Sequence, residues 1–132
     1  MAHVLSFRSS KFDIATEMPN PINPIAGQSV LRWLCEQLRD SPYRTTTPEA
    51  EDWGWYVDVN GAGGSYLVGA SGDPGEPGAS IEWTVQIDKH RSMRDKFTGA
   101  NKMSADDALS ALVERILRSE PGIADVERET DS

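Results

Sequence analysis

The chain has a single cysteine, Cys35, among its 132 residues. An internal disulfide is therefore excluded, and so is a metal site built from several thiolates. No stretch approaches the roughly 18 consecutive apolar residues of a membrane-spanning helix, and residues 1–13 lack the long apolar segment of a secretory signal. We therefore expect a cytoplasmic protein that makes no contact with a membrane.

Basic residues are scarce, since 13 Lys and Arg stand against 21 Asp and Glu, a formal net charge of −8. Between Thr45 and Asp88 the sequence has eight acidic residues and no Lys or Arg. A general nucleic-acid binder needs a broad basic face to neutralise phosphates, so this composition argues against that class and favours a basic partner. The alternative is an acidic surface that only keeps a cytosolic protein of bacterial type in solution.

Length and apolar content predict one domain with its own core. With 38% hydrophobic residues, including four Trp, three Tyr and three Phe, the chain can fold without disulfides or metals. We place this single domain at residues 1–122. Residues 123–132 form an acidic tail in which 123–127 can add a short edge strand, with disorder expected beyond it.

Periodicity and proline placement predict the first elements. Two short runs of period two within residues 3–16 indicate one bulged strand or a hairpin. Asn23 is suited to cap a helix and Pro24 to begin it, and we expect this helix to reach Arg39. Its apolar residues recur at helical spacing: Leu31, Leu34, Cys35 and Leu38.

Alternating apolar and polar residues predict three consecutive strands in the middle of the chain. Residues 53–59 and 81–87 alternate most regularly, and residues 65–70 can return as the antiparallel partner of 53–59 after the turn-forming segment 60–64. The Gly/Pro-rich segment 71–79 is a loop between the second and third strands.

A second helix is predicted to begin at Ser104, whose hydroxyl can cap it with Asp107 three positions later, and to end before Pro121. One wide apolar stripe runs along it and must pack on the sheet: Leu109, Leu112, Val113, Ile116 and Leu117. The element order is then β-α-β-β-β-α with a possible final β. It predicts an α+β fold, a mainly antiparallel twisted sheet with two helices packed on one face.

Pleating assigns the strand residues to two faces of this sheet. We expect one set to face the helices: Trp53, Trp55, Val57, Ile81, Trp83, Val85 and Ile87. The opposite, open face is polar and acidic, and its residues are the candidate partner-binding set: Tyr56, Asp58, Glu82, Thr84, Gln86 and Asp88. The tryptophans of 51–56 are read as core anchors or as an aromatic ligand cleft edged by Glu51 and Asp52.

Trp33 lies off the apolar stripe of its predicted helix, about 160° around from Leu31 at 100° per residue. It is a further candidate anchor for a partner, with packing on a neighbouring loop as the alternative.

No residue pattern predicts catalysis, a metal or a cofactor. His3, His90 and Cys35 share no ligand spacing, and a Cys35 buried on an apolar stripe has a raised pKa and is inert. An acidic turn containing Glu49, Glu51 and Asp52 is explained by solvation, with a hard divalent cation as the alternative.

A basic run directly follows the acidic stretch, since residues 89–102 hold five Lys and Arg and one Asp. Four of its residues are candidate anion- or phosphate-binding residues: His90, Arg91, Arg94 and Lys96. The alternative is a solvated connection that pairs with the neighbouring acidic residues.

The favoured interpretation is a non-enzymatic interaction protein whose acidic open sheet face binds a basic surface on a partner protein. By size and charge alone this suits an inhibitor or immunity-type protein that covers a basic active site, although no motif identifies such a family. The alternative is a small-ligand or phosphate-binding domain, enzymatic or not, that uses the basic loop 89–96. We expect a monomer or a weak homodimer joined through a sheet edge or Trp33.

Overall fold

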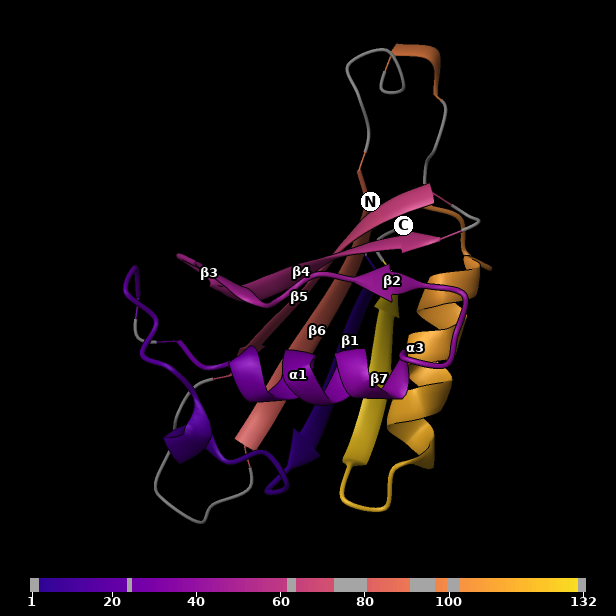
Figure 1. Ribbon diagram of the computed structural model, residues 1–132. Coiled ribbons are helices and arrows are strands. Elements are labelled where there is room, and N and C mark those ends of the chain that lie inside the picture. Colours follow the sequence, from indigo (N-terminus) through magenta and orange to yellow (C-terminus); the bar gives the residue numbers. More distant parts are fainter. Residues whose placement is uncertain are drawn as a thin grey trace.

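The computed structural model describes residues 3–23, 25–61, 64–72, 81–90, 97–99 and 103–130. In them the chain forms one seven-stranded sheet whose strands all pair antiparallel, with two helices packed on one face (Figure 1). The predicted α+β class is confirmed. Neither helix is long and apolar enough to cross a membrane, which holds for every helix in the described residues.

The sheet has the strand order β2-β4-β5-β6-β1-β7, and β3 pairs with β4 on the same side as β2. The strands are β1 (His3–Ser9), β2 (Arg44–Thr45), β3 (Glu49–Glu51), β4 (Gly54–Gly61), β5 (Gly64–Gly72), β6 (Ile81–Lys89) and β7 (Ala124–Thr130). The helices are a 3-10 turn (Ile14–Thr16), α1 (Gln28–Gln37) and α3 (Ala108–Ser119). The segments β4, β5 and β6 are the meander that the alternating pattern predicts.

The first strand of the chain is central in the sheet. β1 pairs with β6 through Leu5 and Val85, and with β7 through Leu5 and Arg128. It is a single strand whose pairing with β7 shifts register between Ser6 and Arg8, and in the described residues the chain then turns through the 3-10 segment and forms no hairpin partner. Phe12, which precedes this turn, is buried against Phe7, with the ring centroids 6.2 Å apart.

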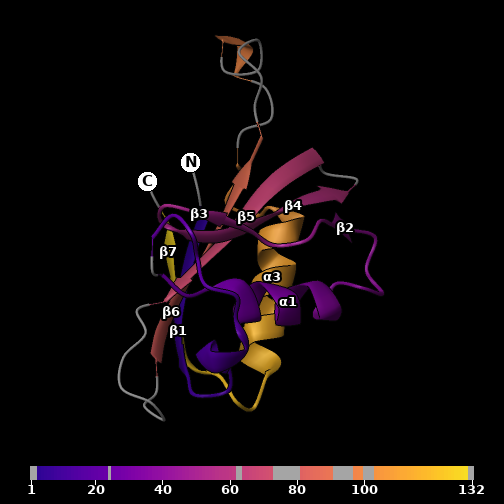
Figure 2. The same cartoon turned by 60° about the vertical axis from the view of Figure 1, so that its left-hand side comes forward.

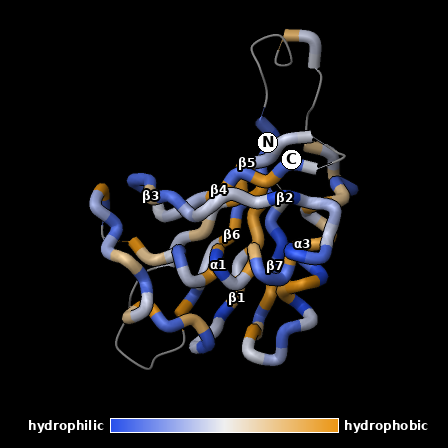
Figure 3. Tube along the Cα trace, in the orientation of Figure 1, coloured by the Kyte–Doolittle hydropathy of each residue, from blue (hydrophilic) through white to orange (hydrophobic). Residues whose placement is uncertain are grey.

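Both helices lie on the same side of the sheet (Figures 1 and 2). α1 packs on β4 and β5, and α3 packs beside β7. Hydrophobic positions concentrate in the central strands, whereas β3 and the chain around β2 are mostly hydrophilic (Figure 3). The largest fully buried side chains form one core between sheet and helices: Trp83, Tyr66, Phe7, Leu5, Leu31, Leu34, Leu38, Ile87, Leu109 and Leu117.

The start of α1 differs from the prediction. The helix begins at Gln28 with Gly27 as its N-cap. The carboxylate of Glu17 accepts the backbone N–H groups of Gly27 and Ser29, at 3.1 and 3.0 Å, and so satisfies donors that a capping side chain would otherwise satisfy. The predicted cap Asn23 instead donates to the carbonyl of Asp52 at 2.9 Å, while the predicted first residue, Pro24, lies outside the described residues.

The start of α3 also differs. The helix begins at Ala108, and its N-cap is Asp107, whose side chain accepts the backbone N–H of Ser110. Ser104 lies four residues before the helix and is exposed. Asp107 prevails because its carboxylate also faces Tyr66 and Lys89 on the sheet, contacts that a hydroxyl at position 104 does not make.

The C-terminal segment is more ordered than its polarity predicts. β7 continues to Thr130, past the expected limit of a short edge strand at 127. It pairs along β1, from Arg8 with Ala124 to His3 with Thr130. The backbone hydrogen bonds of this pairing hold a segment whose side chains are mostly exposed, and residues 131 and 132 lie outside the described part of the chain.

Candidate functional site

The face of the sheet opposite the helices is called the open face below. It contains six of the residues that the sequence predicts to bind a partner. Along β4, Tyr56 and Asp58 are partly exposed between the buried Trp55, Val57 and Val59. Along β6 the same alternation leaves four residues partly or fully exposed: Glu82, Thr84, Gln86 and Asp88. The strand pleat thus places all six side chains on the open face.

Strand register aligns part of this set into one row across the sheet. Tyr56 is paired with Gly69, Gly69 with Gln86, Gln86 with Val4 and Val4 with Glu129. Neighbouring strands are about 4.8 Å apart, so the row crosses β4, β5, β6, β1 and β7 with side chains in reach of one another. Gly69, between Tyr56 and Gln86, leaves a gap in the row.

Trp53 fills that gap, which corrects the prediction that it faces the helices. Trp53 lies in the turn between β3 and β4, and Gly54 after it has a φ of 148°, so the alternation of β4 does not extend back to it. Its indole ring lies over Gly69, where an added Cβ would be only 2.4 Å from Cη2 of Trp53. The sequence signal was the glycine between Trp53 and Trp55, which permits a break in the pleat.

A cavity of about 230 Å³ lies beside this tryptophan on the open face. Its lining consists of Trp53, Gly69, Ala70, Ser71, Thr84 and Gln86. Two cross-strand pairs contribute to it, Gly69 with Gln86 and Ser71 with Thr84. The cavity therefore depends on the pairing of β5 with β6 and on the turn that precedes β4.

The open face is acidic. Carboxylates on it come from four strands: Glu49, Asp58, Glu82, Asp88, Glu127 and Glu129. Among the described residues, the basic groups that meet them are Arg8, 3.4 Å from Glu82, and His90, whose Nε2 lies 2.8 Å from Asp58 Oδ1. In the described part of the chain, Asp88 has no ion-pair partner.

Tyr56 is held in place by this charge. Its hydroxyl donates to Glu49 Oε2 at 2.7 Å. The hydrogen bond to Glu49 and the negative charge of that carboxylate raise the pKa of Tyr56 above its usual value, so the ring stays neutral. Tyr56 therefore presents an aromatic ring with a polar tip on an acidic background.

The other predicted partner residue, Trp33, lies elsewhere. It belongs to α1 on the opposite side of the sheet and is half-buried against the core. Its ring packs edge to face on Phe12 with the centroids 5.5 Å apart, and Nζ of Lys11 lies 6.0 Å from its centroid. The structure thus places Trp33 against the neighbouring loop, the alternative that the sequence left open.

Of the four candidate anion-binding residues, the structure describes one. His90 directly follows β6 and contacts Asp58, whereas Arg91, Arg94 and Lys96 lie outside the described residues. His90 is four residues beyond Gln86, which corresponds to about 13 Å along an extended strand. The histidine and the cavity at Trp53 are therefore separate places on the open face.

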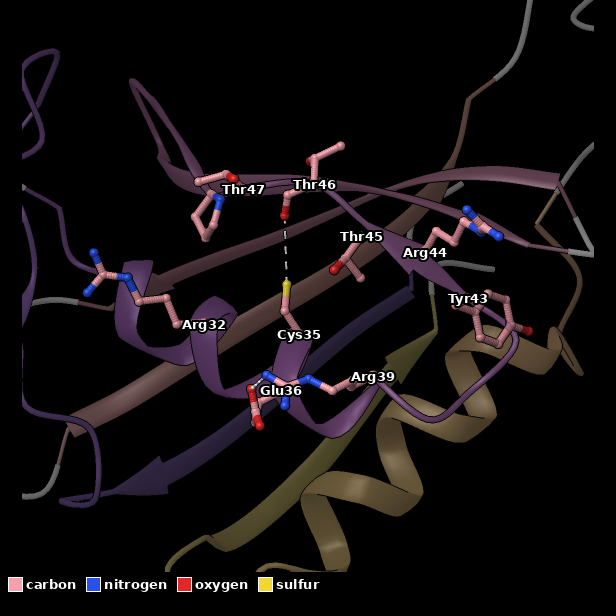
Figure 4. A pocket seen from close by; sticks show the side chains of 10 residues that line it. Arg32, Cys35, Glu36, Arg39, Tyr43, Arg44, Thr45, Thr46 and Thr47 are labelled. Atoms are coloured by element: carbon pink, nitrogen blue, oxygen red, sulfur yellow. Dashed lines mark hydrogen bonds and ion pairs between the residues drawn. The ribbon is translucent and has the colours of Figure 1, made fainter.

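A larger groove of about 660 Å³ lies between α1 and β2 on the other side of the molecule (Figure 4). Cys35 points from α1 to the carbonyl of Thr46, at 4.0 Å, and burial raises the pKa of its thiol, which makes it a poor nucleophile. The side chains of Arg32 and Arg44 point away from each other, while Arg39 turns back to Glu36 (Figure 4). The arginines do not converge on one anion position.

One buried cluster has the residue types of a nucleophile and its base. His3 Nδ1 lies 2.7 Å from Ser110 Oγ, and Arg128 Nη2 donates to both at 2.6 Å. Ser110 has no exposed surface, so a substrate does not reach its hydroxyl. Arg128 also donates to Glu114 at 2.7 Å, and the cluster therefore joins α3 to β1 and β7 as a structural network.

Within the described ranges no three His, Cys, Asp or Glu side chains are grouped to hold a metal ion. In the acidic turn, the carboxylate of Glu49 contacts Tyr56 and that of Glu51 accepts the backbone N–H of Asp52 at 3.2 Å. No family model, curated protein or solved structure matches this chain.

Proposed function

We propose that the protein is a non-enzymatic interaction protein whose acidic open face binds a basic surface on a partner protein. The observation that carries this proposal is the composition of that face, an aromatic centre of Trp53 and Tyr56 surrounded by carboxylates. Both helices pack on the opposite face, so neither described helix covers it. The combination of rigid aromatic rings with complementary charge is typical of interface centres.

The carboxylates would act before and during contact. A one-signed patch attracts an oppositely charged partner and raises the association rate, an effect that salt weakens. On docking, a partner Lys or Arg can pair with Asp88, which has no ion pair within the described residues. The exposed pairs Arg8 with Glu82 and His90 with Asp58 are worth little to stability, and so they can exchange for partner groups at small cost.

The test compares two double charge reversals with the same change in net charge. Glu82→Lys with Asp88→Lys alters the open face. Asp40→Lys with Asp106→Lys alters exposed residues next to the helices and serves as the control. We would capture partners from native lysate on each tagged variant at about 50 mM and about 500 mM salt, and then measure association rates with the protein that is captured.

We expect a basic protein to be retained by the wild type and by the control at low salt, and to be lost from the open-face variant. Its association rate should fall by about tenfold or more in the open-face variant at low salt, because electrostatic steering contributes factors of 10 to 10³. Equal rates for the two variants would remove the open face from the mechanism. Retention of no basic protein would instead favour the small-ligand function proposed for the basic loop 89–96.

A further inference from the structure

Polar side chains line the cavity beside Trp53. Ser71, Thr84 and Gln86 line it, and none of them makes a side-chain hydrogen bond within the described part of the chain. Trp53 also leaves its indole N–H without a protein partner there. These groups offer one aromatic ring and several neutral acceptors to a ligand at one place.

The size of the cavity limits what can occupy it. Its volume of about 230 Å³ is below the roughly 300–1,000 Å³ of pockets that enclose a drug-sized ligand. One long side chain is a better match. Along β6 the lining residues Thr84 and Gln86 are flanked on the same face by Glu82 and Asp88, each two residues away or about 7 Å. The occupant must therefore suit a negative field.

We propose that this cavity receives an arginine side chain of the basic partner, with its guanidinium stacked on the indole of Trp53. This inference rests on the proposed function and names the group that the open face recognises. The guanidinium of arginine is planar and stacks on aromatic rings. Its five N–H groups can donate hydrogen bonds to the side-chain oxygens of Ser71, Thr84 and Gln86. Lysine has the same charge but is a compact, strongly hydrated ammonium, so it gains less from this lining.

Two peptides of equal charge separate this proposal from general attraction to cations. We would titrate the protein with N-acetylated, amidated hexa-arginine and hexa-lysine at about 50 mM salt and measure both dissociation constants. The wild type should bind hexa-arginine about fivefold more tightly, the ratio that one cation–π contact at an exposed site supplies. Trp53→Ala should bind both peptides with the affinity of the wild type for hexa-lysine.

Gly69→Ala is a second variant of the same site, for the case in which Trp53→Ala loses the arginine preference only because it misfolds. It keeps the tryptophan but places a methyl group 2.4 Å from the present position of its ring, so the ring must move. The arginine preference should fall in this variant too. Trp33→Phe, on the helix side of the sheet, is the matched control and should keep the preference unchanged. Circular dichroism verifies that each variant is folded.

Nuclear magnetic resonance gives a second reading of the same site. Hexa-arginine should shift the indole N–H resonance of Trp53, while that of the fully buried Trp83 stays unchanged. Equal affinity of the wild type for the two peptides, an unchanged preference in Trp53→Ala, or no binding of either peptide would each overturn the arginine assignment. Equal affinities that are both weakened by Glu82→Lys with Asp88→Lys would overturn it while leaving the proposed function intact.

Discussion

The sequence predicts Ser104 as the N-cap of α3, whereas the structure has Asp107 in that role. Replacing Asp107 therefore tests the structure directly. Its carboxylate, with only 3% of the side chain exposed, accepts the Tyr66 hydroxyl at 2.8 Å and the Ser110 backbone N–H at 3.1 Å. Lys89 Nζ lies 3.8 Å away, and the side chain of Lys89 is 15% exposed. One carboxylate thus caps a helix and ties it to β5 and β6.

The cost of Asp107→Ala can be worked out from these three contacts. Loss of an N-cap costs about 1 kcal/mol. The Tyr66 hydroxyl, left without an acceptor in a buried site, adds about 1–3 kcal/mol. The lysine loses its counter-charge but can extend to water, which adds about 1 kcal/mol. We expect the free energy of unfolding to fall by roughly 3 to 5 kcal/mol, a large part of the 5–15 kcal/mol typical of a domain.

Urea denaturation followed by tryptophan fluorescence measures these differences. Asp107→Asn keeps an acceptor for Tyr66 and a capping side chain, so it should lose only about 1–2 kcal/mol. Ser104→Ala replaces the cap that the sequence predicted, and because that residue is exposed ahead of the helix it should cost less than about 0.5 kcal/mol. A Ser104→Ala variant that loses as much stability as Asp107→Ala would refute the assignment, as would an Asp107→Ala variant with an unchanged urea midpoint.

Two further predictions concern the core and the buried cluster. Leu117→Ala should lower the free energy of unfolding by about 2–5 kcal/mol, whereas Leu112→Ala, on the same stripe but only partly buried, should cost clearly less; equal losses in urea melts would contradict the packing of α3. Burial and the nearby Arg128 lower the pKa of His3 below its usual 6.5, so below pH 6.5 the unfolded chain takes up a proton that the folded chain resists. Stability contributed by neutral His3 is therefore full above pH 6.5 and is lost as the pH falls below it, by at most about 1.4 kcal/mol per pH unit. Urea midpoints at pH 7.5 and 5.5 should show this loss in the wild type and a smaller loss in His3→Gln. Both pH values lie above the lowered pKa of Glu114, so protonation of that carboxylate does not contribute to the difference.

Local periodicity was enough to find the meander and both helices. The alternation around Val57 and Val85 and the stripe through Leu109 and Leu117 are properties of neighbouring residues, since pleat and helical pitch are determined by the backbone. For the same reason the sequence could assign Asp88 to the polar face of its strand. Helix starts were less predictable, because the groups that cap α1 and α3 are chosen by contacts across the fold as well as by spacing.

The candidate site was only half predictable. The acidic residues on β6 follow from alternation, but the position of Trp53 does not, because a glycine after it interrupts the pleat and either face is open to the ring. The ring of Trp53 can lie over Gly69 on β5 because Gly69 has no side chain. That neighbour is known only once the strands are paired.

The order of residues along the chain is enough to predict which residues share a strand face, how acidic that face is and which segments are helical, because these depend on charge and on short-range backbone geometry. The tertiary structure decided which strands are neighbours. β1 lies between β6 and β7, although residues 5, 85 and 128 are far apart in the chain. A strand pairs where its backbone N–H and C=O groups find hydrogen-bond partners and its apolar face is buried. The same long-range pairing brings Trp53, Gly69 and Gln86 together, and only it creates the cavity on the open face.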